Sequence, residues 1–134
     1  TPSFMSPEQM AGARVDGRSD LYALGVTLFQ LLTGVLPHRP ESMAELIRSI
    51  ANDVAPDVRT LRPELPAALA DIVALALEKR PEIRYADGEA MAADLHAVLV
   101  QLREQARKPA PPPADAPSGG ARPAPGAPEA GHNP

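Results

Sequence analysis

The residue types that most often do chemistry in proteins are few in this sequence and lie far apart. It has no cysteine, and its three histidines, His38, His96 and His132, are widely separated. There is no His-Glu-x-x-His pattern, no glycine-rich phosphate loop and no metal-spaced cluster of aspartates. A thiol nucleophile and a thiolate metal site are excluded. We therefore expect no metal site, and each histidine is expected to have a structural or surface role.

The stretch that stands out is the first ten residues, TPSFMSPEQM. It combines a Thr-Pro and a Ser-Pro-Glu turn signal with Phe4, one of only two phenylalanines in the chain. Little apolar sequence surrounds these residues, so they cannot form a folded unit by themselves. Their role must come from the elements that follow.

Length and charge narrow the classes of protein. A chain of 134 residues forms one domain at most. Its formal net charge of -4 and its scattered basic residues argue against a nucleic-acid surface. The longest uncharged run, residues 21–37, approaches the minimum length of a membrane span. Its polar residues and two glycines favour a buried helix, with a membrane helix as the alternative.

Residues 1–108 are predicted to be helical, with prolines in the turns and no sheet. Helices are expected at 19–33, 41–52, 66–79 and 87–108. Ser19 is the expected cap of the first helix and Gly34 its end, while a Ser42/Glu45 capping box starts the second. The helix at 19–33 is apolar on all sides and is predicted to be a core helix; one stripe consists of Leu21, Leu24, Leu28, Leu31 and Leu32, and the other face of Tyr22, Ala23, Val26 and Phe29. The apolar faces of the later helices are predicted to be Met43, Leu46, Ile47 and Ile50, then Leu69, Ile72, Val73, Ala76 and Leu77, and finally Met91, Leu95, Val98, Leu99 and Leu102.

A change in composition divides the chain at about Lys108. Of the 26 residues at 109–134, 20 are Pro, Ala or Gly, so the segment has almost no large apolar side chains to bury. We predict a disordered linker or tail, and a ligand for SH3-type domains is the alternative.

Three stretches resemble, in order and spacing, the C-terminal lobe of protein serine/threonine kinases, most closely the eukaryotic-like kinases of bacteria. They are TPSFMSPEQ, DGRSDLYALGVTLFQLLTG and KRPEIRYADGEAMAADL. The first resembles the end of the activation segment, Thr-x-x-Tyr/Phe-x-Ala/Ser-Pro-Glu. Its matching residues are Thr1, Phe4, Ser6, Pro7 and Glu8. The second has Asp20 opening a buried helix with Gly25 five residues on, and the third has Arg84 in a turn before the last helix.

The resemblance implies a mainly α fold, the helical C-lobe portion of a kinase, at 1–108. It implies a parent that transfers the γ-phosphate of ATP to Ser or Thr of protein substrates, with Mg²⁺ as a further cofactor. The glycine-rich loop, the strand lysine, the catalytic-loop Asp and Asn and the Asp-Phe-Gly motif do not occur in this sequence. We therefore expect a fragment, cut within the activation segment, that is inactive alone.

The resemblance also implies roles for individual residues. Thr1 would support the catalytic Asp of the parent, and Pro2 and Met5 would line the pocket for the residue after the phosphoacceptor. Glu8 and Arg84 would form a buried ion pair, unless they are unrelated surface charges. Phe4, Pro7 and Asp20 would be structural; Asp20 would accept N–H bonds from the catalytic loop, or simply cap its helix.

Two other interpretations stay open at this point. The parent could be a pseudokinase, or the chain could be a non-catalytic helical interaction or scaffold module whose Ser-Pro-Glu is coincidental. The kinase interpretation implies a cytoplasmic location and protein substrates. It implies no nucleic-acid partner and no membrane contact by this stretch, although the parent could carry a membrane anchor beyond the linker.

Overall fold

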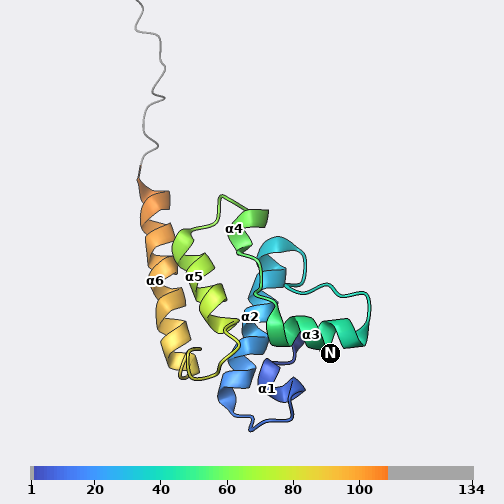
Figure 1. Ribbon diagram of the computed structural model, residues 1–134. Helices are drawn as coiled ribbons and strands as arrows, with labels where there is room; N and C mark the ends of the chain where they lie inside the picture. Colours follow the sequence, from blue (N-terminus) through green and yellow to red (C-terminus); the bar gives the residue numbers. More distant parts are fainter. Residues whose placement is uncertain (1, 109–134) are drawn as a thin grey trace, which may run out of the picture.

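The computed structural model describes residues 2–108, and within them it contains helices and no strand (Figure 1). The elements are η1 (Pro2–Phe4), α1 (Pro7–Met10), α2 (Gly17–Thr33), α3 (Met43–Asn52), α4 (Val58–Leu61), α5 (Ala67–Ala76) and α6 (Gly88–Arg107). The predicted helical class is confirmed over this range. Thr1 and the predicted tail at 109–134 lie outside the described residues.

Helix α2 runs through the middle of the fold, with α5 and α6 on one side and α3 on the other (Figure 1). Tyr22, Val26 and Phe29 on α2 are almost completely buried and pack with residues of α4 and α5 into one apolar cluster. The helix ends at Gly34, whose φ of 79° lies in the left-handed region, as predicted. No helix within residues 2–108 combines the length and apolar character that a bilayer span requires.

The predicted start of α2 is wrong by two residues. The helix begins at Gly17, and the cap is Asp16, whose side chain accepts a hydrogen bond from the Arg18 N–H. Ser19 is instead a buried first-turn residue. Sequence favoured Ser19 because it directly precedes the apolar run, whereas the helix extends one polar turn further back.

One apolar side of α2 is exposed within residues 2–108. Leu21 is buried, but Leu24 is 42% exposed and Leu31 is 74% exposed. The described elements pack on the faces that carry Leu21 and Tyr22, so the remaining apolar side of the helix stays open within residues 2–108.

Helices α5 and α6 form a second apolar cluster with the start of α2. Its buried members are Leu21, Ile72, Ala76, Tyr85, Met91 and Val98. Leu99 and Leu102 of the predicted apolar face are 41% and 42% exposed. Helix α5 has 10 residues and α6 has 20, so the last turns of α6 extend beyond their described partner.

Helix α3 is capped by Ser42 as predicted, because the Ser42 hydroxyl accepts from the Glu45 N–H at 3.2 Å. The return contact differs: the Glu45 carboxylate accepts from the N–H of Glu41, at 3.4 Å. Leu46 and Ile50 are buried, whereas Met43 and Ile47, which also belong to the predicted apolar face, are exposed. The helical period identified one face correctly, but only half of that face has a partner among the described residues.

The close approach of α2 and α5 depends on Gly25. A Cβ at this position would lie 2.8 Å from the Cβ of Ala76 and 3.2 Å from a methyl carbon of Leu77. The first contact is to a methyl group fixed directly on a helix, which cannot rotate away. Gly25 therefore sets how closely the two helices pack.

Gly25→Ala should lower the free energy of unfolding by about 1–3 kcal/mol, the usual cost of overpacking, despite the better helix propensity of Ala. Gly17→Ala is the matched control, because nothing lies within 4 Å of a Cβ built on Gly17. The control should be neutral or stabilising by up to about 1 kcal/mol. Urea unfolding followed by circular dichroism measures both, and equal effects would show that the α2–α5 contact is not tight.

Candidate functional site

The segment at 2–10 has a defined local structure. The Ser6 hydroxyl accepts from the Gln9 N–H at 3.3 Å, and the Gln9 side-chain oxygen accepts from the Ser6 N–H at 2.8 Å. This is a reciprocal capping box, and Pro7 fills the first helical position of α1. Sequence analysis missed α1, although Ser-x-x-Gln is a readable capping signal. It also missed η1 and α4.

The segment is attached to the core through Phe4. This side chain packs against the cluster built around Tyr22, Val26 and Phe29. Pro2 and Met5 are half-buried, and the Met5 N–H donates to the Pro2 carbonyl at 3.1 Å. The apolar contact of Phe4 therefore lies between Pro2 and Met5, which both remain partly accessible.

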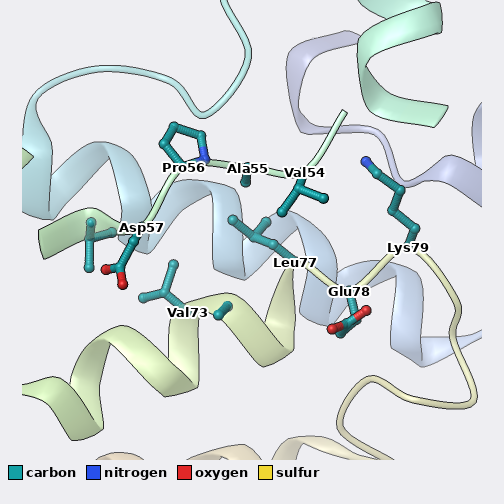
Figure 2. Close-up of a pocket in the computed structure, with 10 residues that line it drawn as sticks. Val54, Ala55, Pro56, Asp57, Val73, Leu77, Glu78 and Lys79 are labelled. Atoms are coloured by element: carbon teal, nitrogen blue, oxygen red, sulfur yellow. The ribbon is translucent and has the colours of Figure 1, made fainter. Parts of the chain in front are cut away.

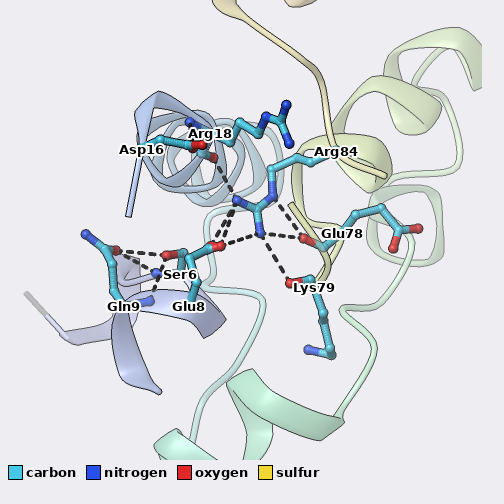
Figure 3. A network of polar contacts seen from close by, with 8 residues as sticks. All are labelled: Ser6, Glu8, Gln9, Asp16, Arg18, Glu78, Lys79 and Arg84. Carbon is cyan, nitrogen blue, oxygen red and sulfur yellow. Dashed lines mark hydrogen bonds and ion pairs between the residues drawn. The ribbon is translucent and has the colours of Figure 1, made fainter. Parts of the chain in front are cut away.

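The predicted pair of Glu8 and Arg84 comes together in the structure, from positions 76 residues apart (Figure 3). The Arg84 Nη1 atom lies 3.0 Å from Oε1 of Glu8, and Nη2 lies 3.2 Å from Oε2. The Arg84 side chain is 0% exposed and that of Glu8 is 7% exposed. A two-pronged contact of this kind fixes geometry as well as charge.

The guanidinium also binds backbone carbonyls on its remaining sides. Nη1 donates to the Arg18 carbonyl at 2.8 Å, while Nε and Nη2 donate to the Glu78 carbonyl at 3.0 and 2.8 Å. An arginine carries five N–H donors, and this set of acceptors can occupy all of them. Arg84 therefore joins α1, the start of α2 and the turn after α5 (Figure 3).

The ring of Tyr22 forms the apolar side of this site. The Arg84 guanidinium carbon lies 5.1 Å from the ring centroid, within the range of a cation–π contact. Burial raises the pKa of Tyr22 to about 12, against the opposing effect of the Arg84 charge. The phenol therefore stays neutral beside the ion pair.

The turn that Arg84 holds is tied to α3 through Lys79, a contact that sequence analysis missed. The Lys79 ammonium donates to the Ile50 carbonyl in the last turn of α3 at 2.6 Å. Burial lowers the pKa of Lys79. Burial and the Lys79 charge lower the pKa of His38. No local sequence pattern predicts a helix cap between residues this far apart.

The other predicted residues are placed as follows. Asp20 lies exposed in the first turn of α2 and does not cap it, because Asp16 does. The Ser19 hydroxyl beside it is buried without a hydrogen-bond partner in the described part of the chain. His96 is exposed on α6. Across residues 2–108, no three His, Cys, Asp or Glu side chains come close enough to hold a metal ion.

Known proteins are similar to most of this chain. It is 44% identical over 107 residues to the serine/threonine-protein kinase Pkn1 of Myxococcus xanthus, which covers 80% of the chain. It is 35% identical over 112 residues to the serine/threonine-protein kinase PknL of Mycobacterium tuberculosis, which covers 83%. The tyrosine-protein kinase MasK of Myxococcus xanthus is 38% identical over 96 residues, or 72% of the chain.

The chain belongs to the bacterial protein kinase family. It spans 15% of the length of Pkn1 and of MasK and 28% of that of PknL, so it corresponds to one part of a kinase. No protein-family model matches the sequence. The helical fold agrees with a portion of the kinase C-terminal lobe.

Glu8→Ala should lower the free energy of unfolding by roughly 3–5 kcal/mol, because it leaves the Arg84 charge buried and unpaired. Arg84→Ala should cost a similar amount, and the double variant should lose less than the two singles added together. Arg84→Lys should restore little of the lost free energy of unfolding. An ammonium has three N–H donors, whereas the acceptors around Arg84 now receive hydrogen bonds from five. Urea unfolding measures the cycle.

The control for this cycle is the exposed pair of Arg80 and Glu82, whose atoms lie 3.8 Å apart. Its single variants to alanine should stay within about 1 kcal/mol of the parent chain. Strictly additive losses at Glu8 and Arg84, or losses as small as those of the control, would contradict a buried coupled pair.

The free energy of unfolding should also change with pH in the alkaline range, because the phenol of Tyr22 ionises there. The folded pKa of about 12 exceeds the unfolded value of about 10. The folded state then keeps its proton longer, so the free energy of unfolding is unaffected below pH 10 and falls between pH 10 and 12, by at most about 3 kcal/mol.

Tyr22→Phe removes this contribution and should flatten part of the alkaline fall. A remainder is expected because burial and a hydrogen bond to Asp94 raise the pKa of Tyr85 as well. Urea unfolding of both chains from pH 8 to 12 is the measurement. Parallel curves would show that the Tyr22 pKa is not raised.

Proposed function

We propose that this chain forms the substrate-binding side of the C-terminal lobe of a serine/threonine protein kinase. The observation that carries the proposal is the buried Glu8–Arg84 pair, which fastens the segment at 2–10 to α2 and to the turn after α5. Pro2 and Met5 remain half-buried at the surface of the segment that is fastened. A substrate polypeptide would lie on these residues.

Six of the first eight residues have a proposed task. Thr1 would direct its hydroxyl to the catalytic Asp of the kinase and help hold a Ser or Thr substrate. Pro2 and Met5 would line the pocket for the substrate residue that follows the phosphoacceptor. Methionine suits a pocket that accepts several apolar side chains, because its unbranched chain adapts its shape. Phe4, Pro7 and Glu8 would hold the segment in place.

The phosphate chemistry is assigned to motifs outside this sequence. Phosphoryl transfer depends on positioning and on charge stabilisation by Mg²⁺, a glycine-rich loop, a strand lysine and the catalytic-loop Asp and Asn. The described residues bring together no metal-binding group, so we assign none of them to Mg²⁺ or to the phosphates of ATP. The isolated chain is accordingly proposed to be inactive, and its contribution is substrate position.

The identity of the substrate hydroxyl is part of the proposal. Pkn1 and PknL are named serine/threonine kinases and MasK a tyrosine kinase. We assign this chain to Ser/Thr substrates because of the proposed role of Thr1. Phosphoamino-acid analysis of the reaction product distinguishes the two outcomes.

A chimera tests the function directly. Residues 1–108 would replace the homologous segment of Pkn1, to which the chain is 44% identical. The chimera should transfer labelled phosphate from ATP to Ser or Thr of a generic basic protein, while the 134-residue chain alone should transfer none. A folded chimera without activity would favour a non-catalytic scaffold, and phosphotyrosine alone would contradict the role of Thr1.

Substrate contact is tested in the same chimera by Met5→Glu. A carboxylate in an apolar pocket should raise the KM for the protein substrate about tenfold, a loss of about 1.4 kcal/mol, and leave the KM for ATP unchanged. Leu61→Glu is the matched control, because Leu61 is 46% exposed on α4. An equal change in both variants, or a change in the KM for ATP, would remove Met5 from the substrate pocket.

A further inference from the structure

A separate apolar pocket lies on the side of the fold where α3, α4 and α5 are joined (Figure 2). Its lining comes from the 54–57 connection, the first residue of α4, the second half of α5 and the turn after it. Val54, Asp57, Ala74, Glu78 and Lys79 belong to this lining. The pocket has a volume of about 280 Å³.

The floor of this pocket is buried and apolar. It consists of Val58, Val73 and Leu77, which are 2%, 2% and 8% exposed and belong to the cluster around α2. The rim includes Val54, whose side chain is 87% exposed. An isolated exposed valine needs no explanation. Here the exposed valine continues the apolar lining outward, so the apolar surface extends from a closed floor to an open rim.

The rim carries the carboxylates of Asp57 and Glu78 and the ammonium of Lys79. The Asp57 carboxylate caps α4 and accepts from the Arg59 N–H at 2.8 Å. In Figure 2 both carboxylates point away from Lys79. The only basic residue of the lining is Lys79, whose ammonium is already held by the Ile50 carbonyl at 2.6 Å. The pocket therefore offers an apolar cavity beside the carboxylate of Glu78, which forms no ion pair within residues 2–108, and this complements an apolar group next to a cation.

Size and shape favour a polypeptide as the occupant. Pockets for cofactors and drug-sized ligands usually hold roughly 300–1,000 Å³, and this one is at the lower limit. It fits a single large apolar side chain, while the exposed Val54 offers a surface for the chain that carries it. Apolar anchors that enter small pockets beside a polar rim are typical of protein interfaces.

We propose that this pocket docks a partner protein through one large apolar side chain followed directly by a lysine or arginine. The apolar side chain enters between Val58, Val73 and Leu77, and the basic side chain lies against Glu78. The site is distinct from the segment at 2–10 and uses none of its side chains. It therefore holds whether or not the chain supports phosphoryl transfer.

Three blocked dipeptides test this proposal on the ¹⁵N-labelled 134-residue chain: acetyl-Phe-Lys-amide, acetyl-Phe-Glu-amide and acetyl-Gly-Lys-amide. Titration of Phe-Lys should shift the amide resonances of Val54, Val58 and Leu77. The Glu and Gly dipeptides should bind at least about threefold more weakly, because each lacks one of the two recognised groups.

Two variants and a control locate the binding. Ala74 is exposed on the pocket wall, so Ala74→Phe should fill the cavity and abolish the shifts without disturbing the core. Glu78→Gln should weaken the Phe-Lys dipeptide about three- to fivefold, the range of one exposed ion pair. Glu104→Gln removes the same charge from the far end of α6 and should change nothing.

Selective binding of Phe-Lys that Ala74→Phe and Glu78→Gln both reduce supports the proposal. Equal binding of all three dipeptides, an effect of Glu104→Gln as large as that of Glu78→Gln, or no shifts at all would overturn it. Shifts of the pocket resonances on raising the protein concentration alone, without peptide binding, would assign the pocket to a second copy of the chain and equally overturn it.

Discussion

The arrangement of this fold depends on the need to satisfy one buried guanidinium. The Arg84 side chain is fully buried, and a buried charge is costly unless it is paired and every donor is bonded. Its acceptors come from α1, from the first turn of α2 and from the turn after α5. Each of these segments must lie within about 3 Å of one planar group, so their relative positions are restricted together.

The apolar packing places those acceptors where Arg84 can reach them. Gly25 lets α2 and α5 approach closely, which sets the position of the α5 end and hence of the Glu78 carbonyl. Phe4 packs on α2 and brings the chain that carries Glu8 to the same place. Tyr22 connects the apolar packing to the ion pair, since its ring belongs to the apolar cluster and also faces the guanidinium.

Local signals in the sequence predicted the helices well and their partners less well. Gly34, Ser42 and Pro66 mark helix ends by conformational preferences that act within a few residues. The helical period shows which residues share a face but not whether another element covers that face, so it does not reveal that Leu31 and Leu99 are exposed among the described residues. Glu8 and Arg84 were paired only through the kinase resemblance, because no short-range rule joins residues 76 positions apart. The contact between Lys79 and the end of α3 had no comparable signal in the sequence.

On the proposed function, these buried contacts matter because phosphoryl transfer depends on position. A substrate held by Pro2 and Met5 is only as well placed as the segment that carries them. That segment has few apolar side chains, so its own burial offsets little of the conformational entropy that is lost when it is ordered. The capping box at Ser6, the packing of Phe4 and the ion pair at Glu8 supply the missing restraint. Residues that never touch the substrate would thus determine how precisely it is presented.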